Sequence, residues 1–350
     1  MNHDPGPLRI AQVAPLIESV PPRAYGGTER VVSYLTEELV RLGHDVTLFA
    51  SSDSRSSARL ISGCDGSLRL NGHAQAGLAQ HLLLLEKVSA RCREFDIIHF
   101  HVDYLHFPMT RLLGAPNLTT LHGRLDGPEL KPIFDEYRDM PLASISNAQR
   151  TPLAFANWAG TVYHGLPQNL LGPNGRPEGY LAFLGRISPE KGVDQAIEIA
   201  RRAGRRIKIA AKIDPIDGDY YERKIEELMR QPHVEFLGEI GEAEKARFLG
   251  GAHALLFPIN WPEPFGLTVI EAMACGTPTI AFNRGSVPEI IENGVTGYIV
   301  NNADEAVSAL SKLEGFDRKR CRERFERRFS VQRMAEDYLA LYRRLLKRPA

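Results

Sequence analysis

The chain has 350 residues, of which 43% are hydrophobic and 25% charged, with 43 basic and 43 acidic residues and a formal net charge of zero. This length predicts two domains, and the balanced charge argues against a dedicated nucleic-acid-binding protein, which carries a basic excess. The four cysteines are widely separated and form no metal-binding or disulfide pattern. No apolar stretch approaches the ~20 residues of a membrane span. We therefore expect a cytoplasmic protein.

Short apolar runs alternate with helical patterns along the whole chain, which predicts an α/β protein with doubly wound parallel sheets. In the first half the predicted strands are Arg9–Ala14, Val46–Ala50, Ile97–His101, Leu118–Leu121, Ala143–Ser146 and Thr161–Tyr163, and the predicted helices include Glu29–Leu42 and Leu78–Phe95. In the second half the predicted strands are Tyr180–Leu184, Ile207–Ala211, Val234–Leu237, Ala252–Pro258, Thr279–Ala281 and Tyr298–Val300. The helices predicted there are Val193–Ala203, Tyr220–Arg230, Glu242–Leu249, Phe265–Cys275 and Val287–Glu292.

The alternation breaks between His164 and Gly179, where glycine, proline and asparagine dominate. We therefore predict an N-terminal domain over residues 1–165 and a C-terminal domain over 166–330. A final helix, from about Val331 to Lys347, could pack on either domain. Two open sheets facing each other would leave a cleft at the carboxyl ends of their strands, where ligands usually bind.

The end of the chain is basic, with 12 Lys/Arg against 5 Asp/Glu from Phe316 to Ala350. A solvated helix face is the simpler explanation. The alternative is attraction to anionic lipid, which would give a peripheral contact with the inner face of a membrane.

The segment from Pro262 to Pro278 contains two acids, Glu263 and Glu271, with seven residues between them. A loop turns into a helix here, and the predicted helix begins at Phe265. Unpaired backbone N–H groups at its start can bind an anion, and the two acids can accept hydroxyl groups. A sugar nucleotide would satisfy both. Alternatively, Glu263 only complements the helix dipole and Glu271 faces solvent.

A second motif, from Gly185 to Gly192, follows the strand Tyr180–Leu184. Arg186 and Lys191 concentrate positive charge at a strand end, as a diphosphate would require, although an ordinary surface turn explains them too. In the first half, Gly26 and Gly27 precede a helix for which Thr28 is the predicted N-cap. Such a loop either approaches a ligand closely or forms a plain tight turn.

Three histidines lie near predicted strand ends: His99, His101 and His122. Their spacing matches no helical two-histidine metal motif, and His122, beside Gly123, is the better candidate for contacting substrate or transferring a proton. Asp217 and Asp219 form a DxD sequence that could hold a divalent cation, but Pro, Gly and Asp also cluster in ordinary turns. We expect no metal site.

Together these motifs resemble the retaining glycosyltransferases of family 4, which have the GT-B fold of two Rossmann-like domains. The resemblance covers nearly the whole chain, and the matching segments are Tyr25–Arg30, Gly185–Arg186, Lys191–Gly192 and Glu263–Pro278. It implies metal-independent transfer of a hexosyl group from a nucleotide sugar, with UDP- or GDP-sugars favoured, to an acceptor hydroxyl. No cofactor is implied, because the nucleotide sugar is a substrate. It also implies that the final helix returns to the first domain.

The resemblance assigns roles to individual residues. Arg186 and Lys191 would hold the diphosphate, and Glu263 and Glu271 would contact the sugar and the ribose. His122 would lie near the transferred sugar. The other contacts would come from Gly27 beside the diphosphate, from backbone N–H groups at Phe265, Gly266, Leu267 and Thr268, and from the backbone of Glu239 and Ile240 near the base.

The loop Ala210–Pro215 departs from the family, because it lacks the usual glycines and carries Lys212. This leaves the nucleotide open. No motif identifies the acceptor, which could be a small molecule, a glycan or a lipid-linked sugar, or the oligomeric state. Two other functions stay open: a GT-B enzyme without an acceptor, such as an epimerase or phosphorylase, and a non-catalytic sugar-nucleotide-binding subunit.

Overall fold

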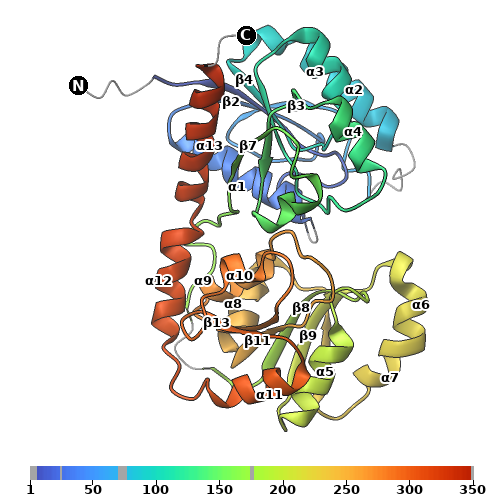
Figure 1. Ribbon diagram of the computed structural model, residues 1–350, viewed down its shortest axis with the longest axis vertical. Helices are drawn as coiled ribbons and strands as arrows, with labels where there is room; N and C mark the ends of the chain where they lie inside the picture. Colours follow the sequence, from blue (N-terminus) through green and yellow to red (C-terminus); the bar gives the residue numbers. More distant parts are fainter. Residues whose placement is uncertain (1–5, 24–25, 70–76, 174–176, 348–350) are drawn as a thin grey trace. The chain divides into compact units, whose positions relative to one another are not determined.

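A computed structural model describes residues 6–23, 26–69, 77–173 and 177–347. The chain divides into two compact units (Figure 1). Unit 1 consists of Met1–Gly165 together with Val331–Ala350, and unit 2 consists of Leu166–Ser330. Each unit has one parallel sheet with helices, which confirms the predicted α/β class.

The sheet of unit 1 has the strand order β3-β2-β1-β4-β5-β6-β7, with all neighbours parallel. Its strands are β1 Arg9–Val13, β2 Asp45–Ala50, β3 Arg59–Ser62, β4 Ile97–Phe100, β5 Asn117–Thr120, β6 Leu142–Ser144 and β7 Trp158–Thr161. The sequence did not predict β3, because this edge strand is only partly buried and lacks a long apolar run. The last strand of this sheet, β7, spans Trp158–Thr161, so the prediction of Thr161–Tyr163 placed it too far along the chain.

The helical segments of unit 1 are α1 Gly27–Arg41, α2 Gly77–Ser89, η2 Cys92–Glu94, α3 Phe107–Leu113, α4 Leu130–Glu136, η3 Ala148–Leu153 and α13 Val331–Leu346. The predicted apolar face of α1, which includes Val31 and Leu35, is buried. The N-cap of α1 is Gly26, so the prediction of Thr28 as the cap was wrong. Gly26 has a φ of 155°, a conformation that favours glycine.

Helix α13 comes last in the sequence but packs beside α1 in unit 1 (Figure 1). Its apolar face buries Tyr338 and Tyr342 completely. Arg333 secures the start of the helix, because its Nη2 donates hydrogen bonds to the carbonyl oxygens of Tyr163 and His164 at 2.6 and 3.0 Å.

The sheet of unit 2 has the strand order β10-β9-β8-β11-β12-β13, again with parallel neighbours. Its strands are β8 Leu181–Arg186, β9 Ile207–Lys212, β10 Val234–Gly238, β11 Ala254–Phe257, β12 Thr279–Phe282 and β13 Gly297–Val300. Its helical segments are α5 Val193–Arg202, η4 Pro215–Asp217, α6 Gly218–Tyr220, η5 Tyr221–Ile225, α7 Glu226–Met229, α8 Glu242–Gly251, α9 Leu267–Ala274, α10 Val287–Ile290, α11 Ala303–Ser311 and α12 Arg318–Arg328. The helix predicted over Tyr220–Arg230 is interrupted by η5, one turn of π-helix.

The basic helix α12 is bound to unit 2 through its arginines. Arg318 donates hydrogen bonds to the carbonyl oxygens of Gly250 and Ala252, and Arg322 donates to that of Ala274. These acceptors lie at or just beyond the C-terminal ends of α8 and α9, where carbonyl groups lack partners within the helix. Part of the basic excess therefore has a structural role. No described helix is both long and apolar enough to cross a membrane.

Both sheets change winding direction beside their first strand, between β1 and β4 in unit 1 and between β8 and β11 in unit 2. In open α/β sheets, ligands bind outside the carboxyl ends of the strands at such a point. The residues that follow β1, β4, β8 and β11 are therefore the first candidates for a functional site.

We predict that unit 1 loses stability steeply in mild acid. Burial lowers the pKa of four of its histidines well below the usual value, and these are His99, His101, His106 and His164. The unfolded chain binds a proton at each of them below pH 6.5, whereas the folded chain does not. Each should therefore remove about 1.4 kcal/mol from the free energy of unfolding per pH unit.

Urea unfolding at pH 7.5, 6.5 and 5.5 tests this prediction. Trp158 and Trp261 are the two tryptophans, so a Trp261→Phe variant leaves Trp158 as a fluorescent reporter of unit 1. The urea midpoint should decrease as the pH is lowered. An equal midpoint at pH 7.5 and 5.5 would contradict the prediction that these buried histidine rings stay neutral in the folded state.

Candidate active site

Two cations of unit 2 lie at and just after the carboxyl end of β8. Arg186 is the last residue of that strand, its Nε lies 3.2 Å from Oδ2 of Asp217, and its guanidinium also pairs with Glu190. Lys191 Nζ lies 2.6 Å from Oε2 of Glu263. The structure therefore brings the predicted residues Lys191 and Glu263 together, and it pairs both cations with carboxylates.

A backbone contact holds this turn against the loop that follows β11. Gly192 has a φ of 70°, and a Cβ added there would lie 2.2 Å from the carbonyl oxygen of Pro258. The backbone N–H of Asn260 also donates to the carbonyl oxygen of Glu190 at 2.8 Å. Only glycine permits this approach, which places Lys191 next to Glu263.

Glu263 is fixed from its other side by the start of the segment after β12. The backbone N–H of Ser286 donates to the carbonyl oxygen of Glu263 at 2.9 Å. A Cβ at Gly285, which has a φ of 53°, would lie 2.4 Å from both the backbone N and O of Glu263. The main chain of Glu263 is therefore held rigidly, and its buried carboxylate points to Lys191.

Helix α9 begins later than predicted. Its first residue is Leu267 and its N-cap is Gly266, so Phe265 and Gly266 precede the helix. Two features favour glycine at position 266. Its φ is 89°, and an added Cβ would lie 3.3 Å from the ring of Phe257. Thr268 lies in the first turn, and its buried Oγ1 has no hydrogen-bond partner among the described residues. Its hydroxyl and the first-turn N–H groups are suited to a bound anion.

Glu271 faces inward, so the alternative of a solvent-facing side chain was wrong. It is 3% exposed, and its Oε1 lies 2.6 Å from Nζ of Lys245, a half-buried residue of α8. The sequence analysis missed Lys245, because a lysine in an amphipathic helix usually indicates a solvated face. Its position could have been found only by knowing that α8 packs beside α9.

Other predicted residues lie along the same edge of the sheet. Lys212 ends β9, and its Nζ is 2.9 Å from Oδ2 of Asp214. Glu239 and Ile240 follow the edge strand β10. Glu239 is exposed and Ile240 half-buried.

Asp217 and Asp219 do not converge on a cation site. Asp217 points to Arg186, and burial raises its pKa while Arg186 opposes the shift. The side chain of Asp219 is 88% exposed. Within the described ranges, no group of three or more His, Cys, Asp or Glu residues could hold a metal ion.

In unit 1, Gly27 is the first residue of α1, and Tyr25 of the same motif lies outside the described residues. His122 follows β5, and its Nε2 is 2.9 Å from Nδ1 of His101. Burial lowers the pKa of His122 to about 3, so the ring is neutral at physiological pH. His99 bonds through Nε2 to Thr120 Oγ1 at 2.7 Å, which argues against a shared metal.

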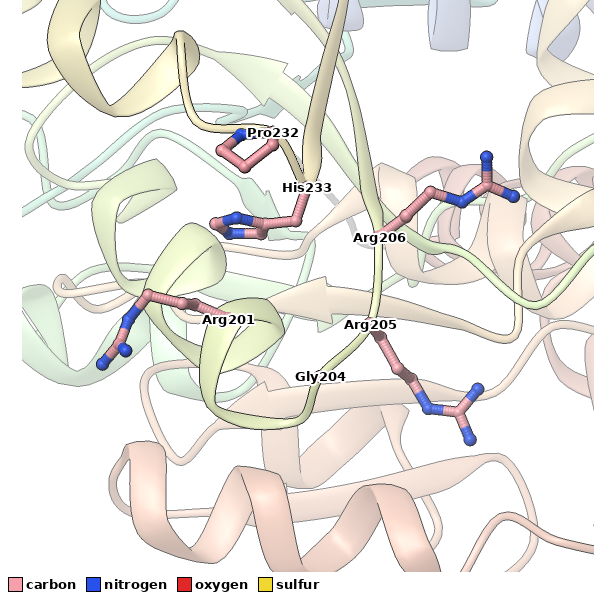
Figure 2. Close-up of a pocket in the computed structure, with 6 residues that line it drawn as sticks. All are labelled: Arg201, Gly204, Arg205, Arg206, Pro232 and His233. Atoms are coloured by element: carbon pink, nitrogen blue, oxygen red, sulfur yellow. The ribbon is translucent and has the colours of Figure 1, made fainter.

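A hollow of about 340 Å³ lies at the opposite edge of the unit 2 sheet, before β9 (Figure 2). Its basic residues do not converge, because the side chains of Arg201, Arg205 and Arg206 point in different directions (Figure 2). Arg201 is also paired with Glu198 at 2.8 Å. The hollow is therefore a poor anion site.

Comparison with known proteins gives a consistent result. Residues 173–327 match the family model described as Glycosyl transferases group 1, and residues 25–162 match Glycosyltransferase Family 4. A probable sucrose-phosphate synthase from Thermosipho melanesiensis is 30% identical over 165 residues, which are 45% of this chain and 39% of that protein. The matched part spans less than half the length of the curated relatives.

Two crystal structures resemble nearly the whole chain. AviGT4, a glycosyltransferase involved in avilamycin A biosynthesis, has a TM-score of 0.75 and 24% identity over 97% of this chain and 98% of its own. HepE of Anabaena in complex with UDP-glucose has a TM-score of 0.73 and 16% identity over 95% and 98%. These likenesses concern the fold.

Two Rossmann-like parallel-sheet units are the architecture of the GT-B fold, which the glycosyltransferase AviGT4 shares. Both halves of the chain match family models of one kind, in chain order. The chain belongs to glycosyltransferase family 4.

We predict that Gly192→Ala destabilises unit 2 more than the matched variant Gly204→Ala. Both glycines have left-handed φ, of 70° and 62°, so both substitutions carry a conformational cost of about 1–2 kcal/mol. At Gly204 an added Cβ would meet nothing within 4 Å, whereas at Gly192 it would collide with backbone. Urea unfolding in a Trp158→Phe background, followed by Trp261 fluorescence, measures the difference. Equal losses would show that the Gly192–Pro258 contact is not restrictive.

Proposed function

We propose that the protein transfers a sugar, with retention of anomeric configuration, from a nucleoside diphosphate sugar to an acceptor hydroxyl. The observation that carries the proposal is the ion pair of Lys191 with Glu263 at the point where the unit 2 sheet changes winding direction, with Arg186 at the carboxyl end of β8. The N-terminus of α9 follows directly along the chain. HepE, which shares the fold, was crystallised with UDP-glucose, which supports a UDP-sugar as donor.

The ion pairs of the site suggest how the donor binds. Arg186 and Lys191 are opposed by Glu190, Asp217 and Glu263, which occupy the positions that phosphate oxygens would take. When a diphosphate binds Lys191, the Glu263 carboxylate is released to accept hydrogen bonds from sugar hydroxyls. One ion pair within the protein is thus exchanged for two contacts with the nucleotide sugar: Lys191 with the diphosphate and Glu263 with the sugar hydroxyls.

Glu271 would bind the ribose in a similar way. Lys245 Nζ contacts its Oε1 and holds the carboxylate in one orientation. The second carboxylate oxygen can then accept a ribose hydroxyl. Because Glu271 lies in the second turn of α9, the ribose would lie further along the helix than the phosphates.

In the proposed reaction, the bond between the anomeric carbon and the phosphate oxygen breaks, and a bond from the acceptor oxygen forms on the same face. The acceptor's proton passes to the departing phosphate oxygen. Negative charge develops on the diphosphate, where Arg186, Lys191 and the α9 N–H groups stabilise it. These groups supply positive charge without a divalent cation, so we propose a metal-independent transfer.

Lys191→Ala should lower kcat/KM at least 100-fold, which corresponds to about 3 kcal/mol of lost transition-state stabilisation. Lys208→Ala is a matched control, because the side chains of both lysines are 21% exposed and both lie near carboxylates. Lys208 lies near the amino end of β9, away from the proposed site. Near-normal turnover by Lys191→Ala, measured with the donor selected below, would refute the diphosphate assignment.

A thermal-shift panel of UDP-, GDP- and ADP-sugars should identify the donor, because a ligand at 100 times its Kd stabilises the folded state by about 2.7 kcal/mol. We expect the largest shift with a UDP-sugar, and the same shift in EDTA. Lys191→Ala should abolish it. Loss of the shift in EDTA with recovery in Mn²⁺ would instead favour a cation at Asp217, and no shift with any donor would argue against the proposed function.

A further inference from the structure

A line of buried polar side chains runs along the carboxyl edge of the unit 1 sheet. Gln12 comes from β1, His99 beside it in register from β4, and Thr120 from β5. His101 directly follows β4, and His122 lies two residues beyond the end of β5. Helix α13 adds Tyr338 and Tyr342 from the far end of the sequence. Only His122 of this set has so far been given a role.

Hydrogen bonds join these groups into one continuous series, called the hydrogen-bond chain below. His122 Nε2 is 2.9 Å from His101 Nδ1, and His101 Nε2 is 2.8 Å from Gln12 Oε1. Gln12 Nε2 donates to the hydroxyl of Tyr342 at 3.2 Å, and that hydroxyl is 2.7 Å from His99 Nδ1. The chain continues through His99 Nε2 to Thr120 at 2.7 Å, and from Thr120 to the Tyr338 hydroxyl at 3.0 Å.

The Gln12 amide gives this chain a direction. Its carbonyl oxygen can only accept, so His101 must donate from Nε2. A neutral imidazole carries one N–H, and burial keeps His101 neutral by lowering its pKa. His101 Nδ1 therefore accepts, and His122 must donate to it from Nε2.

The remaining nitrogen of His122 is then left with a lone pair. Its Nδ1 is buried and has no hydrogen-bond partner within the described part of the chain. The residue as a whole is half-buried, and a Cβ added at the neighbouring Gly123 would meet nothing within 4 Å, so there is space beside it. A buried acceptor without a partner is costly unless a ligand satisfies it.

We propose that Gln12, oriented by Tyr342, is a positioning residue that fixes His122 as its Nε2–H tautomer, so that Nδ1 accepts a hydrogen bond from a hydroxyl of the bound sugar. The second part of this proposal rests on the proposed glycosyltransferase function. The tautomer itself does not, because it follows from the hydrogen bonds and from the buried, uncharged ring of His101. Helix α13 thereby contributes to substrate recognition without touching the substrate.

Nitrogen NMR of the ¹⁵N-histidine-labelled full chain tests the tautomer without any substrate. The His122 signals are identified by their absence in His122→Gln. We expect an unprotonated Nδ1 and a protonated Nε2 in the wild type, and a mixture of tautomers in Gln12→Met. A protonated Nδ1 in the wild type would overturn the proposal.

Thr119→Val is the matched structural control. Thr119 is fully buried, and its hydroxyl forms a 2.8 Å hydrogen bond with Nε2 of His106. His106 does not belong to the hydrogen-bonded series that connects His122 to Tyr338. This variant should change the His106 signals and leave those of His122 unchanged. An equal change at His122 in both variants would indicate general loosening of unit 1 and would contradict a specific role for Gln12.

A double-mutant cycle tests the connection to catalysis. Gln12→Met should lower kcat/KM about tenfold in the wild-type background, as expected for one lost hydrogen bond, and should have no further effect in His122→Ala. Additive losses would overturn the positioning role. If no donor is turned over at all, the proposed function fails while the NMR result still decides the tautomer.

Discussion

The proposed donor site of unit 2 depends on the close backbone approach of Gly192 to Pro258. This contact fixes the turn after β8 against the loop after β11, and the contact of Gly285 with the backbone of Glu263 fixes that loop from its other side. Both contacts require the absence of a side chain, and they hold the backbone of the two loops together. The ion pairs above them can rearrange, since Lys191 and Glu263 need only rotate their side chains. A rigid backbone with exchangeable charges is well suited to binding and releasing a charged substrate.

The two units provide different chemistry at equivalent edges of their sheets. In unit 2 the edge carries cations paired with carboxylates, which suits a diphosphate. In unit 1 it carries imidazoles, an amide and hydroxyls, and burial lowers the pKa of His99, His101 and His122, so their rings are neutral near pH 7. Neutral donors and acceptors suit sugar hydroxyls, whose recognition requires direction more than charge.

The basic segment near the C-terminus shows why composition alone can mislead. The excess of Lys and Arg suggested either a solvated face or attraction to lipid. In the structure, Arg318, Arg322 and Arg328 donate to backbone carbonyl oxygens of unit 2. Arginine suits this role because its guanidinium has several donors in one plane and can reach more than one carbonyl.

The sequence by itself determined both parallel sheets and the motif positions, because burial of strands and helix faces leaves local periodic patterns. It predicted eleven strands at nearly their observed places but missed the half-exposed β3 and misplaced β7. It also predicted that Glu263 and Lys191 contact a ligand, but not that their side chains pair with each other. Only the tertiary structure decided that Lys245 pairs with Glu271, that Gln12 contacts His101 and that Tyr342 of α13 contacts Gln12. These contacts join residues 26 to 330 positions apart, and their partners depend on how helices dock, which no local pattern records.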